Sequence, residues 1–347
     1  MAKTDLTNLS LSGLTEFLVN LGLPEYRGVQ VFSWLYRNNI TDFSQMTDLS
    51  RELRDTLAAC AEFSWPRITE VEHSKDSTVK YGLLLKDNNY IEAVLIPEED
   101  RKTLCVSTQV GCAMGCEFCL TGSIGFKRNL TPGEIVGQVV RVNNWLHEKQ
   151  GPDAELNNLV FMGMGEPLAN FDNLLTALEI LVEQRGLDFS ERRITVSTCG
   201  LVPKIIELGQ KTRVNLAVSL HSVDDSLRSE LMPINRKYPV DELLAACKSF
   251  PMPKRKRIMF EYILIKNLND SEADARMLAR KLKGIPCKIN LLPYNESAGL
   301  PFRRPADETI EVFQKLLWQE GYTVLVRSSR GADISAACGQ LAGKMIS

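Results

Sequence analysis

The sequence lacks any run approaching the roughly 18 consecutive apolar residues that a membrane-spanning helix needs. Its first residues, Met1 to Asp5, also lack the charged stretch and the following apolar stretch of a secretion signal. We therefore expect a cytoplasmic protein that has no membrane partner.

An excess of charge of one sign is also missing, because 41 Lys and Arg residues stand against 43 Asp and Glu residues, for a net charge of −2. Composition alone therefore gives no argument for nucleic-acid binding, and any site for a polyanion must be a local patch. With 44% hydrophobic and 24% charged residues, the chain has the proportions of a folded globular protein, which excludes disorder as its main state.

Histidine is scarce, with three residues, whereas cysteine is present nine times. An odd number of cysteines spread over a long chain without a secretion signal argues against a disulfide framework. Thiols that stay reduced, for metal binding or catalysis, are the better interpretation.

The N-terminal part of the chain has helical periodicity. Apolar residues recur at helical spacing from Leu11 to about Phe63, which predicts several short helices. Two strands, Val79–Leu85 and Tyr90–Ile96, are expected to follow as a hairpin. We predict a small helical accessory module over residues 1–90 that ends in this hairpin, and a larger core over residues 91–347.

The core alternates short apolar segments with amphipathic ones. The predicted strands are Thr103–Val110, Asn158–Met162, Arg193–Ser197, Val214–Ser219, Ile258–Ile265, Cys287–Leu292 and Thr323–Arg327. The predicted helices are Thr131–Glu148, Asp172–Gln184, Val202–Thr212, Val240–Phe250, Ser271–Lys283 and Asp307–Glu320. This alternation predicts an α/β fold with a parallel sheet, either doubly wound or curled into a full or partial barrel, and periodicity does not separate these forms.

Three cysteines follow the first core strand at the spacing C-x3-C-x2-C, namely Cys112, Cys116 and Cys119. A zinc site would need a fourth Cys or His nearby, and the three histidines are scattered along the chain. Three thiolates on a four-iron cluster leave one iron without a protein ligand, where chemistry can take place. An iron–sulfur cluster is therefore favoured.

These three cysteines, with Phe118 before the last of them, resemble the cluster motif of the radical S-adenosylmethionine (SAM) superfamily. The resemblance implies a 4Fe-4S cluster whose open iron binds the amine and carboxylate of SAM. It further implies that one electron cleaves SAM to a 5′-deoxyadenosyl radical, and that the core is a partial (β/α)6 barrel with the cluster loop after its first strand.

A narrower resemblance, to the RlmN/Cfr family, covers about residues 85–347 and more loosely the whole chain. The segments that carry it are Thr121-Gly122, Gly125–Leu130, Phe161–Asn170, Ser219–His221, Leu231–Asn235 and Arg330–Leu341. The family methylates adenosine in ribosomal RNA. The resemblance implies 23S rRNA as substrate, an external electron donor of the flavodoxin type, a monomer, and an N-terminal module that contacts RNA.

Several residues at or just past strand ends are assigned to SAM by this resemblance. They are Gly165, Glu166, Ser197, Ser219, Leu220, His221 and Asn295. Taken without the resemblance, the glycines indicate a tight strand-to-helix turn and the polar side chains indicate caps or loop hydrogen bonds.

The resemblance also assigns the catalytic residues Cys338, Cys105 and Glu92. Because carbons 2 and 8 of adenine are electron-poor, their direct attack on the methyl group of SAM is unfavourable. In the family, one SAM first methylates the cysteine matching Cys338, and the radical from a second SAM converts that methyl group into a methylene radical that adds to adenine.

Two residues then compete for the proton of the ring carbon. By resemblance, Cys105 is the base or the thiol that closes a transient disulfide with Cys338, and Glu92 is an alternative proton acceptor. Alone, a free cysteine is usually a small buried hydrophobe and a strand glutamate usually lies on a solvated face. The cysteines that match no motif, Cys60, Cys199, Cys247 and Cys287, are expected in the core.

Local basic patches are the expected RNA contacts, although a run of charge is usually only a solvated face. The clearest run is Lys254–Arg257, and further charges near motifs or in the N-terminal module are Arg27, Arg37, Lys127, Arg128, Arg236 and Lys237. An adenine carbon is reached only when the base is unstacked, which favours a single-stranded or loop adenosine.

Two reaction outcomes remain open within the family, methylation of carbon 2 and methylation of carbon 8, the latter conferring antibiotic resistance. The segments Ile96–Arg101 and Gly165–Pro167 are more similar to the carbon-2 branch, whose members also act on the adenosine 3′ to the anticodon in tRNA. Carbon 2 is therefore expected. Two other classes compete: an RNA-binding module with structural zinc, and a radical enzyme that does not act on RNA.

Overall fold

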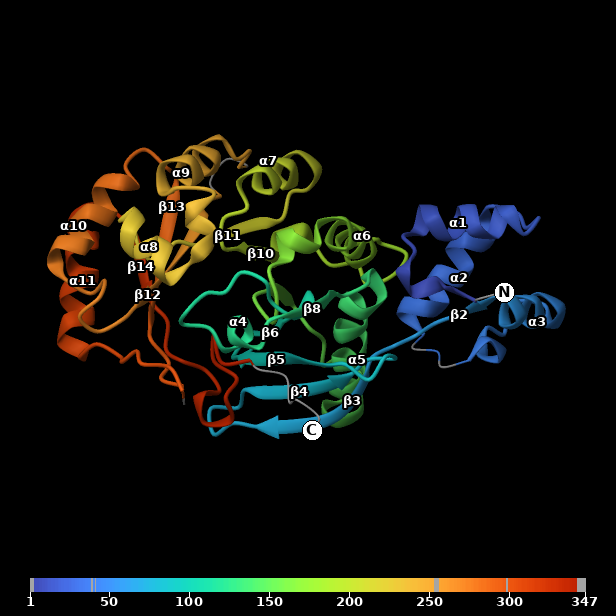
Figure 1. Ribbon diagram of the computed structural model, residues 1–347. Helices are drawn as coiled ribbons and strands as arrows, with labels where there is room; N and C mark the ends of the chain where they lie inside the picture. The colour runs from blue at the N-terminus through green and yellow to red at the C-terminus, as the bar shows by residue number, and fades with distance from the viewer. Residues whose placement is uncertain (1–2, 39, 41, 253–255, 298, 342–347) are drawn as a thin grey trace.

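The computed structural model describes residues 3–38, 40, 42–252, 256–297 and 299–341. In Figure 1 a curved array of strands and helices forms the larger part of the molecule, and a small helical module projects from one end. Residues 254 and 255 of the predicted basic run lie outside the described residues.

The helices are α1 (Leu11–Asn20), α2 (Tyr26–Arg37), α3 (Arg51–Cys60), α4 (Leu120–Ile124), α5 (Pro132–Gln150), α6 (Phe171–Val182), α7 (Val202–Lys211), α8 (Asp225–Leu231), α9 (Val240–Ser249), α10 (Glu272–Lys281) and α11 (Asp307–Gln319). The strands are β1 (Thr4–Asp5), β2 (Ala61–Glu62), β3 (Arg67–His73), β4 (Val79–Leu84), β5 (Tyr90–Glu98), β6 (Arg101–Cys105), β7 (Gln109–Gly111), β8 (Phe126–Asn129), β9 (Asn158–Phe161), β10 (Ile194–Thr198), β11 (Asn215–Ser219), β12 (Ile258–Leu264), β13 (Cys287–Pro293) and β14 (Thr323–Val326).

One ten-stranded sheet organises the core, in the order β14-β13-β12-β11-β10-β9-β6-β5-β4-β3. Strands β6 and β9 to β14 run parallel, each next to the one that follows it in the chain. Helices lie on the outer side of this curved sheet, as Figure 1 shows. The α/β alternation and the partial barrel expected from the sequence are therefore confirmed.

The predicted strand Thr103–Val110 is wrong as a single strand. Strand β6 ends at Cys105, and β7 pairs instead with β8 in a separate two-stranded sheet. Between them the chain bends, because the Ser107 N–H donates to Gln138 Oε1 at 2.9 Å and the Thr108 N–H donates to the Met164 carbonyl at 2.8 Å. Residues compatible with a strand on both sides of Ser107 concealed this bend.

The strands predicted to close the N-terminal module belong to the main sheet. Strand β4 pairs antiparallel with β5, and β5 pairs antiparallel with β6, so the sheet continues across residue 90. The helical part of the module docks on the core, where the Gly133 N–H donates to Asn8 Oδ1 at 3.0 Å. The division at residue 90 stays a prediction.

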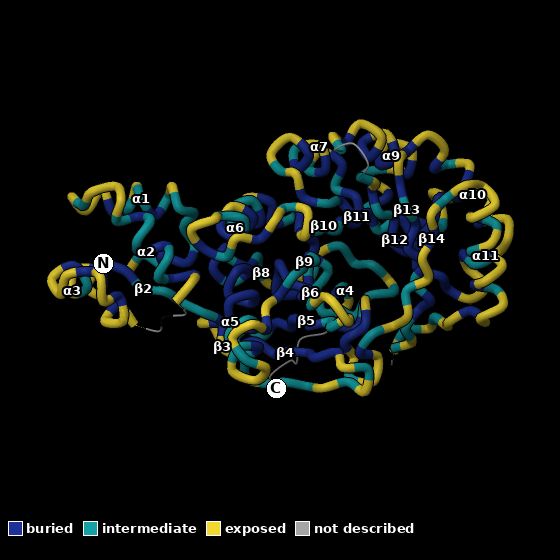
Figure 2. The backbone as a smooth tube through the Cα atoms, turned by 180° about the vertical axis from the view of Figure 1, so that it is seen from behind, coloured by how far each residue is buried: buried dark blue, intermediate teal, exposed yellow. Residues whose placement is uncertain are grey.

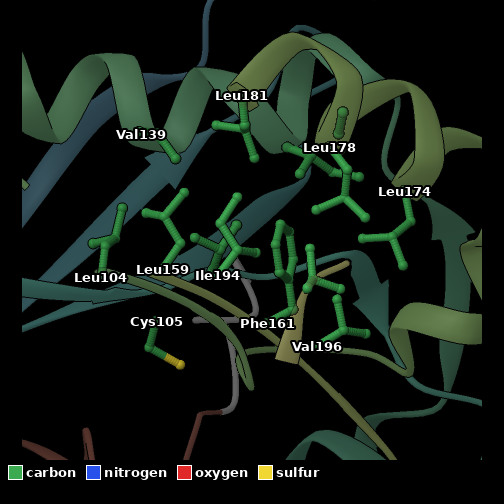
Figure 3. Packing of buried hydrophobic residues seen from close by; sticks show 14 of the residues in the cluster. Leu104, Cys105, Val139, Leu159, Phe161, Leu174, Leu178, Leu181, Ile194 and Val196 are labelled. Carbon is green, nitrogen blue, oxygen red and sulfur yellow. The ribbon is translucent and has the colours of Figure 1, made fainter. Parts of the chain in front are cut away.

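Buried side chains alternate with concave-face side chains along the parallel strands. Leu104, Leu159 and Ile194 are fully buried and point toward the helices α5 and α6, whereas Cys105 points to the opposite face (Figure 3). Each fully buried aliphatic side chain stabilises the fold by about 1.5–3 kcal/mol. The strand period of two therefore holds the sheet against its helices and leaves the other face for chemistry.

Figure 2 shows that the sheet is mostly buried, whereas the outer turns of α1, α3, α10 and α11 are exposed. Among the helices that the structure describes, none combines the length and the apolar character required to cross a membrane.

Candidate active site

A cavity lies on the concave face at the carboxyl ends of the parallel strands. Its walls come from the cluster loop, from the ends of β9 to β13 and from the C-terminal loop. Among the described residues, its lining includes Cys112, Cys116, Cys119, Met162, Gly165, Glu166, Ser197, Cys199, Ser219, His221, Glu261, Ile263, Leu292, Cys338 and Gly339. Carboxyl ends of barrel strands are where such folds place their active sites.

The three motif cysteines lie in the loop between β7 and α4. Gly111 opens this loop with φ of 75°, and a Cβ there would lie 1.8 Å from the Gly125 carbonyl oxygen, so only glycine fits. The Cys112 N–H donates to the same carbonyl at 3.1 Å, which folds the loop back over the cavity.

These thiols would repel one another as thiolates, so their anionic form is disfavoured without a metal. Burial raises the pKa of Cys112 to about 11 and raises that of Cys116 further, and the charges of the neighbouring thiols raise both. A bound iron–sulfur cluster would relieve this repulsion, because iron stabilises thiolates. Within the described part of the chain, no three His, Cys, Asp or Glu side chains are placed as ligands of one metal ion.

Glu166 is a buried carboxylate whose backbone N–H hydrogen-bonds to the Cys112 sulfur. Its Oε1 accepts the Leu168 N–H at 2.9 Å and its Oε2 accepts the Cys199 N–H at 2.7 Å. Burial raises the pKa of Glu166, and these hydrogen bonds oppose the shift. The Cys199 thiol and the Thr198 hydroxyl also hydrogen-bond to this carboxylate, so Glu166 could attract an ammonium group in the cavity through its negative charge.

The glycine before Glu166 is required by its surroundings. Gly165 has φ of 95°, and a Cβ there would lie 2.4 Å from Gln109 Cβ. Gln109 in turn accepts the Glu166 N–H at 2.8 Å through its Oε1. The Gly-Glu pair is therefore fixed by β7, a contact that the sequence did not reveal.

His221 lines the cavity in an uncommon backbone conformation, with φ of 59°. Its Nδ1 accepts the Ile263 N–H at 3.1 Å, and its ring meets Phe118 edge-on at 4.8 Å. Burial and the charge of Arg228 lower the pKa of His221 to about 3, so the imidazole is neutral at physiological pH.

The remaining residues assigned to SAM divide into two groups. Ser197 and Ser219 line the cavity, as expected for residues at the ends of parallel strands. Leu220 is fully buried and Asn295 donates to the Cys338 carbonyl at 3.4 Å, and neither belongs to the described cavity lining. For all of these residues, contact with SAM stays a prediction.

Sequence reasoning missed Arg228, whose guanidinium lies fully buried beneath the cavity. It donates to the carbonyls of Leu220, Cys199 and Ser219 at 3.0, 2.8 and 3.1 Å. It thereby ties together the carboxyl ends of β10 and β11. An arginine in a short amphipathic helix gives no sequence signal of this role.

The C-terminal loop brings Cys338 to the cluster loop. The Leu120 N–H donates to the Gly339 carbonyl at 2.8 Å, which seats the loop against α4. Cys338 and Cys105 are both free thiols that influence each other across the concave face. Burial and the Cys338 charge raise the pKa of Cys105 to about 12. Desolvation of its sulfur also raises the pKa of Cys338, and the charge of Arg327 opposes this shift.

Glu92 lies outside the described cavity lining and is buried, so the expectation of a solvated strand glutamate is wrong. Its Oε1 lies 3.5 Å from Lys80 Nζ. On the sheet, Val94 is opposite Cys105, so Glu92, two residues away on β5, shares the face of Cys105.

The other unassigned cysteines are mostly core residues, as expected. Cys247 and Cys287 are buried away from the cavity and Cys60 packs partly buried against the core. Cys199 is the exception, because it is buried yet lines the cavity.

A second hollow, which we call the basic groove, occupies the amino-terminal half of the same concave face. Its basic side chains are Arg101, Arg192, Arg193, Lys256, Arg257, Lys288, Arg327 and Arg330. It adjoins the thiol cavity, because Asn290 in the groove donates to Glu261 Oε1 in the cavity at 2.9 Å. The groove is a local positive patch of the kind that a chain without net positive charge would need to bind a polyanion.

Two arginines predicted to contact RNA instead make contacts within the protein. Arg37 donates to the Gly186 carbonyl at 3.3 Å, where α2 docks on the core. Arg128 pairs with Asp87 at 2.6 Å and with Glu134 at 2.7 Å. Their charges are therefore largely satisfied by neighbouring residues.

A partial α/β barrel with three cysteine thiols in the loop after its first strand defines a radical SAM protein. Residues 106–278 match the family model of the radical SAM superfamily, and residues 4–63 match the ribosomal RNA large subunit methyltransferase N-terminal domain. Membership of this superfamily implies an iron–sulfur cluster and SAM.

Similar proteins define the family more closely. The chain is 56% identical over 345 residues to the dual-specificity RNA methyltransferase RlmN of Desulfotalea psychrophila, covering 98% of this chain and 95% of that protein. It is 52% identical to the protein of the same name from Geobacter sulfurreducens, covering 98% and 92%. A radical SAM methyltransferase from Sphaerobacter thermophilus has a similar structure, with a TM-score of 0.91 and 45% identity over 97% of this chain and 99% of that one. The chain belongs to the RlmN family of radical SAM methyltransferases.

Proposed function

We propose that the protein methylates carbon 2 of an adenosine in the peptidyl-transferase centre of 23S rRNA, and of the adenosine 3′ to the anticodon in tRNA. The supporting observation is that Cys338 lines one cavity with Cys112, Cys116 and Cys119, while Cys105 adjoins it on the same face. Relatives that match nearly the whole chain are named dual-specificity RNA methyltransferases.

The cofactors of this reaction are a 4Fe-4S cluster and two molecules of SAM per turnover, with an external electron donor of the flavodoxin type. When bound, they supply the methyl group and, after one-electron cleavage of SAM, the 5′-deoxyadenosyl radical. Cys112, Cys116 and Cys119 hold the cluster. Glu166 would attract the ammonium group of SAM through its negative charge, and Ser197, Ser219 and neutral His221 line the pocket.

Cys338 is the methyl carrier and Cys105 the residue that releases the product. Cys338 loses its proton with help from Arg327, the charge that opposes the raised pKa of this thiol. Cys105 keeps its proton at neutral pH, because burial raises its pKa to about 12. Its sulfur bonds to the Cys338 sulfur as the carbon–sulfur bond to the base breaks, and the electron pair of that bond together with the Cys105 proton completes the new methyl group.

The positions of Cys105 and Glu92 favour the thiol as the residue that meets the Cys338 sulfur. The charge of Cys338 acts on Cys105 across the concave face, whereas Glu92 is held in an ion pair with Lys80. We therefore assign the closing of the disulfide to Cys105, because a thiol that keeps its own proton does not take the proton of the ring carbon.

The basic groove binds the phosphates next to the unstacked adenosine, since phosphate contacts position a nucleic acid on its enzyme. In the Lys288→Gln variant we expect KM for RNA to rise several-fold with little change in kcat. The slope of log KM against log salt should fall by about 0.7, the value for one lost phosphate contact on a single strand. Lys315→Gln, an exposed change on α11, is the matched control. An unchanged salt slope would place the RNA elsewhere.

The test of the function is anaerobic turnover on protein-free 23S rRNA with labelled SAM, followed by nuclease digestion and chromatography against methyladenosine standards. We expect 2-methyladenosine. A peak of 8-methyladenosine would move the protein to the carbon-8 branch, and product on tRNA alone would restrict the substrate. A colourless, zinc-containing protein would contradict the radical mechanism altogether.

A further inference from the structure

The loop that carries Cys338 is held at its far end by the turn between β3 and β4. Asp76 Oδ2 accepts the Gly331 N–H at 2.9 Å. Asp333 accepts the Ser74 hydroxyl at 2.5 Å and the Lys75 N–H at 3.1 Å. In Figure 1 the red C-terminal segment accordingly lies beside the blue strands β3 and β4. Segments from opposite ends of the chain thus meet at the methyl-carrying loop.

Lys80 on β4 makes the deepest contact with this loop. Its side chain is only 8% exposed, and Nζ donates to the Ile334 carbonyl at 2.7 Å. The same ammonium lies 3.0 Å from Glu72 Oε1 and 3.5 Å from Glu92 Oε1. Burying a cation costs several kcal/mol unless partners of this kind surround it. The ammonium is therefore tied to the two carboxylates and to the loop together.

Lys80 also lies on the same sheet as the Cys105 thiol. Lys80 lies opposite Val94 on β5, and Val94 lies opposite Cys105 on β6. Opposite residues in neighbouring strands project from the same face, so these three form one row across the sheet. The anchor of the Cys338 loop and the Cys105 thiol are thus built on the same rigid strands.

The backbone between the anchor and Cys338 is constrained. Gly331 has φ of 65°, and a Cβ there would lie 2.9 Å from Thr78 Cγ2 on β3–β4. Ser335 has a left-handed conformation with φ of 52°, which is uncommon for a residue other than glycine. A loop of this shape needs external contacts to keep it, and Lys80 provides one of them directly before Ser335.

We propose that Lys80 is a positioning residue that sets the Cys338 thiol against Cys105 through the Ile334 carbonyl. The contacts of Lys80 and of the Ser74–Thr78 turn with the C-terminal loop together form what we call the latch. The inference rests on the proposed role of Cys338 as methyl carrier. That role requires one sulfur to meet SAM, the adenine carbon and Cys105 in turn, and displacements of about 1 Å cost reaction rate heavily. The latch holds the backbone of the loop in place, so that the Cys338 sulfur keeps one position.

The test compares Lys80→Met with wild type and with Lys281→Met. Lys281 is a suitable control because it also joins two elements through an ion pair, to Asp241 at 2.5 Å, on the outer helices. The first measurement is the alkylation rate of Cys338 by iodoacetamide in the full-length protein, followed by peptide mass spectrometry. The second is kcat and KM for RNA, and the third is the thermal unfolding midpoint.

In Lys80→Met we expect Cys338 to alkylate roughly tenfold faster and kcat to fall roughly tenfold, with KM for RNA unchanged, as for loss of one charge-assisted hydrogen bond. Lys281→Met should match wild type in both rates. A purely structural lysine would lower the unfolding midpoint without changing Cys338 reactivity in the folded protein, which would overturn the proposal.

A second variant protects the test against misfolding of Lys80→Met. Asp333→Ala removes only an exposed part of the latch, and it should accelerate alkylation of Cys338 in the same direction. If neither folded variant changes the alkylation rate, the latch does not exist. If wild type makes no methylated RNA while both variants accelerate the alkylation of Cys338, the latch stands and the proposed function fails.

Discussion

Cys338→Ala is expected to abolish RNA methylation while reductive cleavage of SAM continues. The substitution removes the sulfur that carries the methyl group, so we expect a loss of roughly 10³-fold or more, as for other enzymes that lose their nucleophile. The cluster thiols are left in place, and the loop keeps its backbone bonds, including the one from Leu120 to Gly339. Labelled methyl in RNA and 5′-deoxyadenosine should be measured in the same reactions.

The matched control is Cys247→Ala, which removes a buried thiol on α9 away from the cavity. It should keep kcat near that of wild type, with only a modest loss of stability from the cavity that it creates. Methyl transfer by Cys338→Ala at the wild-type rate would exclude the cysteine-carried route. The protein would then have to deliver the methyl group to RNA directly.

Local patterns in the sequence predicted the local features of the site. The three cluster cysteines lie within one short loop, so their spacing alone placed their thiols together in one cavity. The strand–helix alternation predicted the parallel sheet for the same reason, because each unit is encoded by neighbouring residues. The strand after Thr103 failed because its bend is imposed by Gln138 on α5, which lies far along the chain.

Features that depend on contacts between distant segments could not be predicted from pattern. Nothing near Lys80 in the sequence indicates that its ammonium meets the Ile334 carbonyl, since the two residues approach only after the sheet has formed. Glu92 likewise resembled a solvated strand residue until β4 and β6 covered it on both sides. Cys105 and Cys338 needed the family resemblance, because the fold alone brings them together.

Cys116→Ala is expected to remove the iron and, with it, both SAM cleavage and RNA methylation. A cluster that loses one of three protein ligands is no longer held, so the reconstituted protein should lose its visible absorbance and its iron and sulfide content. This outcome differs from Cys338→Ala, in which iron and SAM cleavage remain. Iron retained in Cys116→Ala would exclude this thiol as a ligand.

Cys199 raises the question of whether three or four cysteines bind the metal. It lines the same cavity, so a four-cysteine metal site must be considered beside a three-cysteine cluster. Its thiol, however, hydrogen-bonds to Glu166, and a thiol that spends its proton on this hydrogen bond is not the thiolate that a metal needs. Cys199→Ala should therefore keep its iron and colour. Loss of metal from this variant would mean that four thiolates fill the site and leave no open iron for SAM.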